Sequence, residues 1–221
     1  MSQNLYTAVD NYLAETLITP DPVMDAVLKS CEDAGLPAIA VTPTQGKFLQ
    51  IIARIISAKR ILEIGTLGGY STIWLARALP PNSQVVTLEF NPKHAEVAQE
   101  NFRRASVESL IQLHIGAALD TLPKIAATTP PAFDLIFIDA DKKNNPHYFQ
   151  WALKLSRSGT VIIIDNVVRE GKVIDADSDD PDIVGTRQVL SDIANEPRVS
   201  ATALQTSDAK GHDGFAVALV L

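Results

Sequence analysis

The sequence predicts an α/β fold, with a Rossmann-like, doubly wound and mostly parallel sheet, an antiparallel C-terminal strand pair and extra N-terminal helices. Two observations support this prediction. Between residues 60 and 194, short apolar runs alternate with stretches of helical periodicity, an order typical of parallel sheets covered on both faces. Residues 199–206 and 215–221 are strand-like, and the eight residues between them are too few for a helical crossover, so these strands should pair antiparallel.

The first 58 residues are expected to form a helical layer within a single domain spanning residues 1–221. Its first helix is predicted over 4–17, and Asp21 followed by Pro22 is typical of an N-cap before a helix that ends near Gly35. Thr42-Pro43-Thr44-Gln45 matches a capping box, in which the Gln45 side chain would reach back to the cap.

After this layer, strands and helices alternate. The expected strands cover residues 61–64, 85–88, 111–115, 133–138 and 161–164. The expected helices cover residues 71–78, 92–105 after an Asn91 cap, 121–127, 146–155 after an Asn145 cap, and 183–194 after an Asp182 cap. Residues 128–131 are expected to form a loop.

Composition narrows the class of protein. The chain has 221 residues, 46% of them hydrophobic and 20% charged, which suits one sizeable core. A net charge of -7 argues against a nucleic-acid or anionic-membrane surface. Because no apolar stretch reaches about 18 residues and residues 1–10 do not resemble a signal peptide, a cytoplasmic protein is expected. The single cysteine, Cys31, is expected to be a buried helix residue rather than a reactive thiol.

A glycine-rich turn follows the first strand. Gly65, Gly68 and Gly69 expose backbone N–H groups just before a helix begins, which suits a small polar ligand. The alternative is a tight connection without a ligand. Leu67 breaks the G-x-G-x-x-G pattern and no Gly-Lys-Ser/Thr follows, so NAD and ATP are disfavoured.

Ligands of open parallel sheets bind at the carboxyl ends of the strands. Those ends carry Gly65, Glu89, Gly116, Asp139, and Asp165 with Asn166. Glu89 lies 24 positions after Gly65, close to the offset at which an acid binds ribose hydroxyls in nucleotide folds. The alternative for Glu89 is a solvated acid at a strand end.

Asp139, Asp165 and Asn166 offer three hard oxygen donors without Cys or His, a set that suits Mg²⁺ or Ca²⁺ better than Zn²⁺. Alternatively, Asp165 and Asn166 make only local Asx turns. Residues 175–182 contain five aspartates, but the sixth position of a calcium loop would be Asp180 and the twelfth Thr186, so this segment is interpreted as a solvated loop.

Several short motifs occur together and in order. They are Leu62-Glu63-Ile64-Gly65-Thr66 with Gly69-Tyr70-Ser71, Phe137-Ile138-Asp139-Ala140-Asp141-Lys142, Asp165-Asn166, and Asp213-Gly214. With them the chain, from Val41 to its last strand, resembles the cation-dependent class I O-methyltransferases that use S-adenosylmethionine and include catechol and caffeoyl-coenzyme A O-methyltransferases.

The resemblance implies a set of site residues. Those holding S-adenosylmethionine would be Val41, Glu63, Gly65, Thr66 and Ser71 on the methionine side, Glu89 at the ribose, Gly116 to Ala118 at the adenine, and Asp139 at the cofactor amine. Those holding Mg²⁺, or another hard cation such as Ca²⁺ or Mn²⁺, would be Asp139, Asp165 and Asn166. Lys142 would be the general base, the alternative being an exposed lysine at a helix start. A homodimer is also implied.

The chain departs from the family pattern where the acceptor should bind. Val168-Arg169-Glu170 stands where plant-type enzymes usually have Leu-Trp-Asn, so Arg169 and Glu170 are predicted to contact the substrate, with Arg169 facing an acidic substituent. Asn145 replaces a frequent Tyr. The expected activity is metal-dependent methyl transfer to a hydroxyl of a small catechol-like or hydroxycinnamoyl-type phenol. The alternatives are a metal-independent or N-directed methyltransferase, a non-catalytic cofactor-binding relative and, last, a nicotinamide oxidoreductase.

Overall fold

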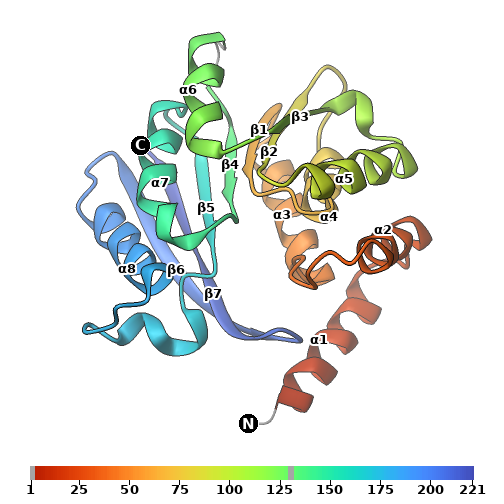
Figure 1. The fold of residues 1–221 in the computed structure, drawn as a ribbon, viewed down its shortest axis with the longest axis horizontal. Helices are drawn as coiled ribbons and strands as arrows, with labels where there is room; N and C mark the ends of the chain where they lie inside the picture. The colour runs from red at the N-terminus through yellow and green to blue at the C-terminus, as the bar shows by residue number, and fades with distance from the viewer. Residues whose placement is uncertain (1–2, 129–131) are drawn as a thin grey trace.

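The computed structural model describes residues 3–128 and 132–221 and is built around one seven-stranded sheet (Figure 1). The strands are β1 Arg60–Ile64, β2 Gln84–Glu89, β3 Ile111–Ile115, β4 Leu135–Ile138, β5 Val161–Asp165, β6 Val199–Asp208 and β7 Gly211–Val220. Their order is β3-β2-β1-β4-β5-β7-β6, with β1 to β5 parallel and β7 antiparallel to both of its neighbours. The predicted fold class is confirmed.

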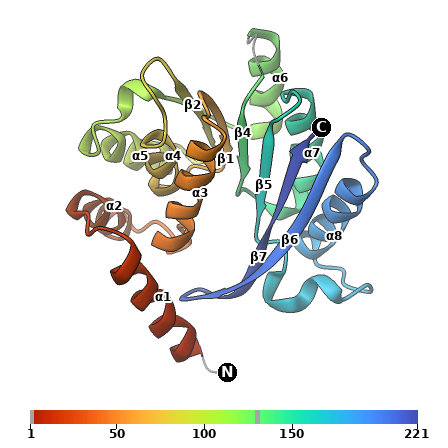
Figure 2. The ribbon, with the colours of Figure 1, turned by 180° about the vertical axis from the view of Figure 1, so that it is seen from behind.

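Helices cover both faces of the sheet. They are α1 Gln3–Leu17, α2 Pro22–Asp33, α3 Pro43–Ile55, α4 Tyr70–Ala76, α5 Pro92–Arg104, α6 Ala118–Thr128, α7 Asn145–Lys154 and α8 Pro181–Ala194. Short 3-10 helices occupy η1 Glu108–Leu110, η2 Lys142–Asn144 and η3 Arg169–Ile174. Figures 1 and 2 show α6, α7 and α8 on one side, α3, α4 and α5 on the other, and α1 extending from the body of the molecule.

The central strands are buried on both faces, as expected for a parallel sheet between two helical layers. Alternate residues face opposite layers. On β5, Ile162 and Ile164 belong to the core under α6 to α8, whereas Val161 and Ile163 belong to the core under α2 to α5. Because successive residues face opposite layers and both layers are buried, the strands appear in the sequence as continuous apolar runs rather than as an apolar–polar alternation.

The predicted caps of α2 and α3 are confirmed. Asp21 Oδ1 accepts a hydrogen bond from the N–H of Val23 at 3.0 Å, and Thr42 Oγ1 accepts one from the N–H of Gln45 at 3.3 Å. The second half of the capping box is wrong, because the Gln45 side chain does not return to the cap. Its Nε2 donates instead to Asp165 Oδ2, 2.7 Å away and 120 residues later.

Two other caps were predicted one or two residues from their true positions. Asn144, not Asn145, is the N-cap of α7, and Asn145 is a fully buried helical residue whose side-chain amide has no hydrogen-bond partner among the described residues. The cap of α8 is Asp180, whose Oδ1 accepts from the N–H of Asp182 at 2.9 Å. Asp182 is thereby free to accept from the N–H of Lys143 at 3.1 Å.

Two connections also differ from expectation. Thr128 is the last residue of α6, which begins at Ala118, and the rest of the predicted loop, residues 129–131, lies outside the described residues. The predicted connection 207–214 is mostly strand, because the β6–β7 ladder continues to the pair Asp208–Gly211. The hairpin is therefore longer than predicted, and Lys210 lies at its tip.

This tip contacts the N-terminal helical layer (Figures 1 and 2). Gln3 Nε2 donates to the backbone oxygen of Asp208 at 2.9 Å. Lys210 Nζ donates to the backbone oxygens of Ile39 at 3.0 Å and Ala40 at 2.7 Å, in the connection between α2 and α3. Cys31 is buried, as expected. Among the described residues, none forms a helix long and apolar enough to cross a bilayer.

Candidate active site

The register of the sheet brings the predicted polar residues to one edge. On β4 and β5, Ile138 pairs with Ile164, so Asp139 and Asp165 follow at the same level on neighbouring strands. Gly65, Glu89 and Gly116 end or follow β1, β2 and β3 at the same edge. Parallel strands with matched ends place residues that are 26 positions apart in the sequence side by side.

A cavity of about 810 Å³ opens at this edge. Among the predicted cofactor residues, those lining it are Val41, Gly65, Thr66, Ser71, Glu89, Gly116, Ala118 and Asp139. Lys142, Asn166 and Arg169 line the same cavity. The cavity is of the size that small-molecule and cofactor sites occupy, and its lining includes the acids Glu89 and Asp139.

Glu63 does not belong to that lining among the described residues. It is fully buried beneath the cavity, where its carboxylate accepts hydrogen bonds from Ser71 Oγ at 2.7 Å, from Thr87 Oγ1 at 2.6 Å and from the hydroxyl of Thr72. Burial raises the pKa of Glu63 to about 7, against the opposing effect of these hydroxyl donors and helped by the charge of Asp139. Glu63 therefore acts on the cavity through Ser71, which does line it.

Gly65 is required by close packing at the end of β1. Its φ is 103°, in the region that favours glycine, and a Cβ there would collide with the backbone oxygen of Asp139. The backbone N–H of Asp139 in turn donates to the oxygen of Ile64 at 2.9 Å. The N–H of Gly65 donates to the backbone oxygen of Leu88 at 3.0 Å, so this glycine serves the tight junction between β1 and β4 and does not offer the ligand the free N–H group that the sequence suggested.

Glu89 is held rigidly at the end of β2. Its Oε2 accepts from the N–H of Leu67 at 2.7 Å and of Thr66 at 3.2 Å, and its Oε1 accepts from the N–H of Asn91 at 2.9 Å. His94 Nδ1 lies 3.2 Å from Oε1. Sequence reasoning missed His94, which lines the cavity from the first turn of α5, because no motif marks it.

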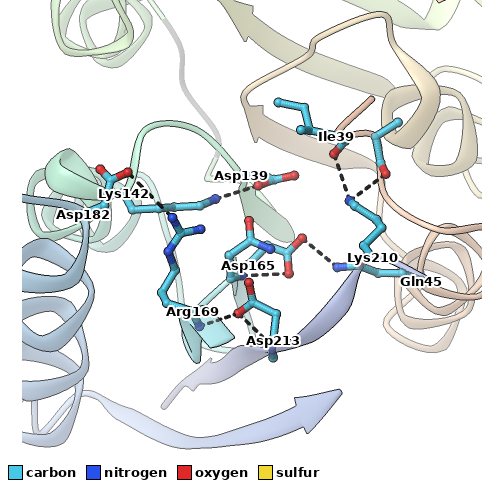
Figure 3. Close-up of polar contacts among 12 residues, drawn as sticks. Ile39, Gln45, Asp139, Lys142, Asp165, Arg169, Asp182, Lys210 and Asp213 are labelled. Carbon is cyan, nitrogen blue, oxygen red and sulfur yellow. Dashed lines mark hydrogen bonds and ion pairs between the residues drawn. The ribbon is translucent and has the colours of Figure 1, made fainter. Parts of the chain in front are cut away.

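Asp139 and Asp165 lie near one another (Figure 3), beside the large cavity and a smaller one of about 170 Å³. Asp139 lines the large cavity, Asp165 the small one and Asn166 both. Asp139 Oδ1 accepts from Lys142 Nζ at 2.7 Å. Lys142 is only 6% exposed, so the alternative of an exposed lysine at a helix start is wrong.

Asp165 is 4% exposed and lies close enough to Asp139 for their charges to interact. Burial and the charge of Asp139 raise the pKa of Asp165 to about 7, while Lys142 opposes this shift. Asp165 is thus buried and Asp139 half-buried, and two neighbouring carboxylates of this kind are hard oxygen donors that could hold a cation. Among the described residues, no group of three or more His, Cys, Asp or Glu side chains is arranged to hold a metal ion. The predicted set has only two such side chains, those of Asp139 and Asp165, because its third member, Asn166, is an amide.

The small cavity is lined mostly by polar side chains from η3, α8 and the β6–β7 hairpin. Arg169 lines both cavities and Glu170 lines the small one. Arg169 and Glu170 have φ of 56° and 57°, a left-handed conformation that is strained for such residues. Glu170 is paired with Lys172 at 3.1 Å, whereas the Arg169 guanidinium makes, among the residues that the structure describes, only a distant 3.9 Å pair with Asp182.

Asp213 holds this strained segment in place. Its Oδ1 accepts from the N–H groups of Val168 at 3.0 Å, Arg169 at 2.9 Å and Gly214 at 2.9 Å (Figure 3). The sequence indicated Asp213-Gly214 only as a motif. The structure gives it a physical role, which is to fix the backbone from which Arg169 extends towards the cavities.

The fold and the cavity define a Rossmann-like protein that binds its ligand at the carboxyl edge of the sheet. A sequence model of the O-methyltransferase family matches residues 15–211. The chain therefore belongs to the O-methyltransferase family, whose class I members depend on S-adenosylmethionine. The resemblance described above is thereby confirmed.

Individual relatives agree with this assignment. The chain is 53% identical to a catechol O-methyltransferase of Mycobacterium tuberculosis over 212 residues, which cover 96% of this chain and 94% of the relative. It is 48% identical over 220 residues to a catechol O-methyltransferase of Niastella koreensis, with complete coverage of both chains. The crystal structure of an O-methyltransferase from Bacillus cereus in complex with SAH superposes with a TM-score of 0.98 at 55% identity, covering 100% of both chains.

Proposed function

We propose that this chain transfers the methyl group of S-adenosylmethionine to a hydroxyl group of a catechol-like or hydroxycinnamoyl-type phenol, and that it requires a divalent cation. The observation that carries the proposal is the matched ends of β4 and β5. They bring Asp139 to the lining of the large cavity and Asp165 to that of the small one, with Asn166 lining both, and the large cavity has the volume for the methyl donor.

The methyl donor fits the large cavity on three grounds. The Glu89 carboxylate lies at the end of β2, where an acid accepts hydrogen bonds from ribose hydroxyls. Gly116 and Ala118 line the cavity at the start of α6, on the predicted adenine side, and Ser71 lines it at the start of α4, on the predicted methionine side. Asp139 follows β4, the neighbour of β1, and would face the amino group of the donor.

The residues at the junction of the two cavities fit a divalent cation. Asp139, Asp165 and Asn166 provide hard oxygen donors, and Asp165 is close enough to Asp139 for the two carboxylates to act on one cation. Mg²⁺ is the first expectation, and Ca²⁺ and Mn²⁺ share its preference for oxygen. A cation bound there would supply positive charge beside the acceptor hydroxyl, which favours the ionised form of a phenol whose ordinary pKa is about 10.

The chain's own residues account for the remaining chemistry. Lys142 Nζ lies 2.7 Å from Asp139 Oδ1, at the cavity wall, and its neutral amine is the form proposed to accept the hydroxyl proton, which converts it to the ammonium. The acceptor oxygen then attacks the sulfonium methyl carbon, so that an O–C bond forms, the C–S bond breaks and S-adenosylhomocysteine leaves. Buried, hydrogen-bonded side chains keep the reacting groups aligned, which lowers the entropic part of the barrier.

Arg169 and Glu170 are proposed to lie on the acceptor side of the site. Arg169 reaches both cavities and has only a 3.9 Å ion pair, so its charge is available to an acidic substituent of the acceptor. Glu170 is turned towards Lys172 and would influence the acceptor through the charge of the small cavity. In Arg169→Ala the preference for a carboxylated catechol over catechol should fall about tenfold. An unchanged preference removes this role.

The central experiment incubates the protein with labelled S-adenosylmethionine, Mg²⁺ and a panel of catechols, hydroxycinnamates and their thioesters. We expect label on a hydroxyl oxygen, loss of turnover after thorough chelation and recovery on adding Mg²⁺. Turnover that survives chelation favours the metal-independent alternative, label on nitrogen the N-directed one, and cofactor binding without turnover a non-catalytic relative. The homodimer expected from the resemblance stays a prediction, which analytical ultracentrifugation would test.

A further inference from the structure

We propose that Gln45 is a positioning residue of the cation site, because its side-chain amide fixes the carboxylate of Asp165. The inference rests on the proposed function, since it concerns how tightly the proposed site holds its cation. It assigns a role to a helix-start residue that the sequence pattern explained by capping alone.

Two donors hold Asp165 from two directions (Figure 3). Gln45 Nε2 donates to Oδ2 at 2.7 Å, and the N–H of Asn166 donates to Oδ1 at 2.9 Å. A carboxylate oxygen accepts about two hydrogen bonds, so each oxygen keeps one acceptor position. The terminal torsion of an aspartate is broad and weakly determined by itself. With both oxygens bonded, the plane of the carboxylate is set before a cation arrives.

Gln45 is itself held firmly. It lies in the first turn of α3, where Thr42 Oγ1 accepts its backbone N–H at 3.3 Å. The Thr42 hydroxyl is 2.9 Å from that of Thr44, which donates to Asp10 Oδ1 on α1 at 2.8 Å. Further along α3, Leu49 is buried against the core. The amide therefore approaches Asp165 from a rigid element, which is what an orienting contact needs.

The fold does not need this contact to place Asp165. The backbone of Asp165 is already held in the sheet, where it pairs with Phe215 of β7. The side-chain bond adds nothing to that ladder and acts only on the carboxylate group. Gln45 lines the small cavity together with Asp165, and among the described residues it does not line the large cavity. Its effect should thus reach the cation and leave the methyl donor untouched.

The test is Gln45→Met, which keeps the length of the side chain and removes the amide. Binding of Mn²⁺ to the donor-free protein is measured by electron paramagnetic resonance and calorimetry. Because partners that orient a metal ligand typically contribute a factor of 10 to 100 to metal affinity, we expect binding at least about tenfold weaker. Binding of S-adenosylhomocysteine in the presence of a chelator should be unchanged. At saturating Mg²⁺ kcat should be near wild type, while the Mg²⁺ concentration for half-maximal rate rises by the same factor.

Gln50→Met is the matched control. Gln50 lies on the same helix, is 5% exposed and accepts from Lys47 Nζ at 2.9 Å, away from Asp165. It should leave Mn²⁺ binding unchanged. If a folded Gln45→Met protein binds Mn²⁺ within twofold of wild type, or if both variants weaken it equally, the positioning role is wrong. If wild type binds no Mn²⁺ at all, the cation requirement in the proposed function is wrong, and the role of Gln45 is wrong with it.

Discussion

Replacing Glu63 by glutamine should remove a pH dependence from the stability of the fold. Glu63 is fully buried, and its pKa is raised from 4.5 to about 7, first by burial and then by the charge of Asp139. Its protonated form therefore suits the folded state better than its charged form. Glutamine has nearly the same shape and never ionises, and it can still accept hydrogen bonds from the neighbouring hydroxyl groups, such as that of Ser71.

The linkage between proton binding and folding gives the sign and the size of this pH dependence of stability. Between the unfolded pKa of 4.5 and the folded pKa of about 7, the folded protein binds more protons than the unfolded chain. The stabilising contribution of Glu63 is therefore complete below about pH 4.5 and is lost as the pH rises through about 7. Each pKa unit corresponds to about 1.4 kcal/mol, so the full effect is about 3 kcal/mol, of which about 2 kcal/mol falls between pH 5.5 and pH 8.

Urea denaturation of wild type and Glu63→Gln at about pH 5.5 and pH 8, with chelator and without methyl donor, measures this difference. The free energy of unfolding of wild type should fall by about 2 kcal/mol more than that of the variant over this range. Other titrating groups, such as Asp165, contribute to both proteins and cancel in the comparison. Parallel pH profiles for the two proteins would refute the assignment of a strongly raised pKa to Glu63.

Three further changes test the site. Gly65→Ala should destabilise the fold by about 3 kcal/mol, since a Cβ meets the backbone oxygen of Asp139 at a left-handed φ; a melting temperature equal to that of wild type contradicts this. Lys142→Met should lower kcat by a factor of about 10² to 10⁴ while calorimetry finds donor binding retained, and an unchanged kcat excludes it as the base. Asp213→Ala removes the hydrogen-bond acceptor of three backbone N–H groups, so the free energy of unfolding should fall by about 2 kcal/mol. The backbone of Arg169 would no longer be fixed, so the KM for the phenolic substrate should rise; unaltered KM and stability would argue otherwise.

The sheet could be predicted because its information is local. Each central strand is a short apolar run ending in glycine or an acid, and the rule that ligands bind at strand ends converts that order into a place in space. Asp139 and Asp165 were predicted to be neighbours on this ground, and the register of β4 and β5 places them so. The length of the β6–β7 hairpin was missed because its polar tip residues look like a loop in the sequence, yet backbone pairing continues through them.

The residues that sequence reasoning misplaced are those that prefer a distant partner to a local one. Gln45 fits a capping box, but its amide donates to Asp165. Asn145 precedes a proline in the manner of a cap, but the helix begins there and the preceding Asn144 takes the cap position. The predicted cofactor role of Glu63 stays a prediction, since the structure shows only that this residue is fully buried and accepts a hydrogen bond from Ser71. Local patterns describe what a side chain can do, and tertiary contacts decide between the options.

The ammonium group at the hairpin tip has a consequence for how the protein is made. Lys210 reaches the backbone oxygens of Ile39 and Ala40, which border Val41 in the wall of the large cavity, across about 170 residues of sequence. During synthesis that wall must wait until the β6–β7 hairpin, which is made long after the N-terminal helices, has left the ribosome. The nascent protein therefore cannot acquire a complete site for its methyl donor before both strands of that hairpin are available to fold.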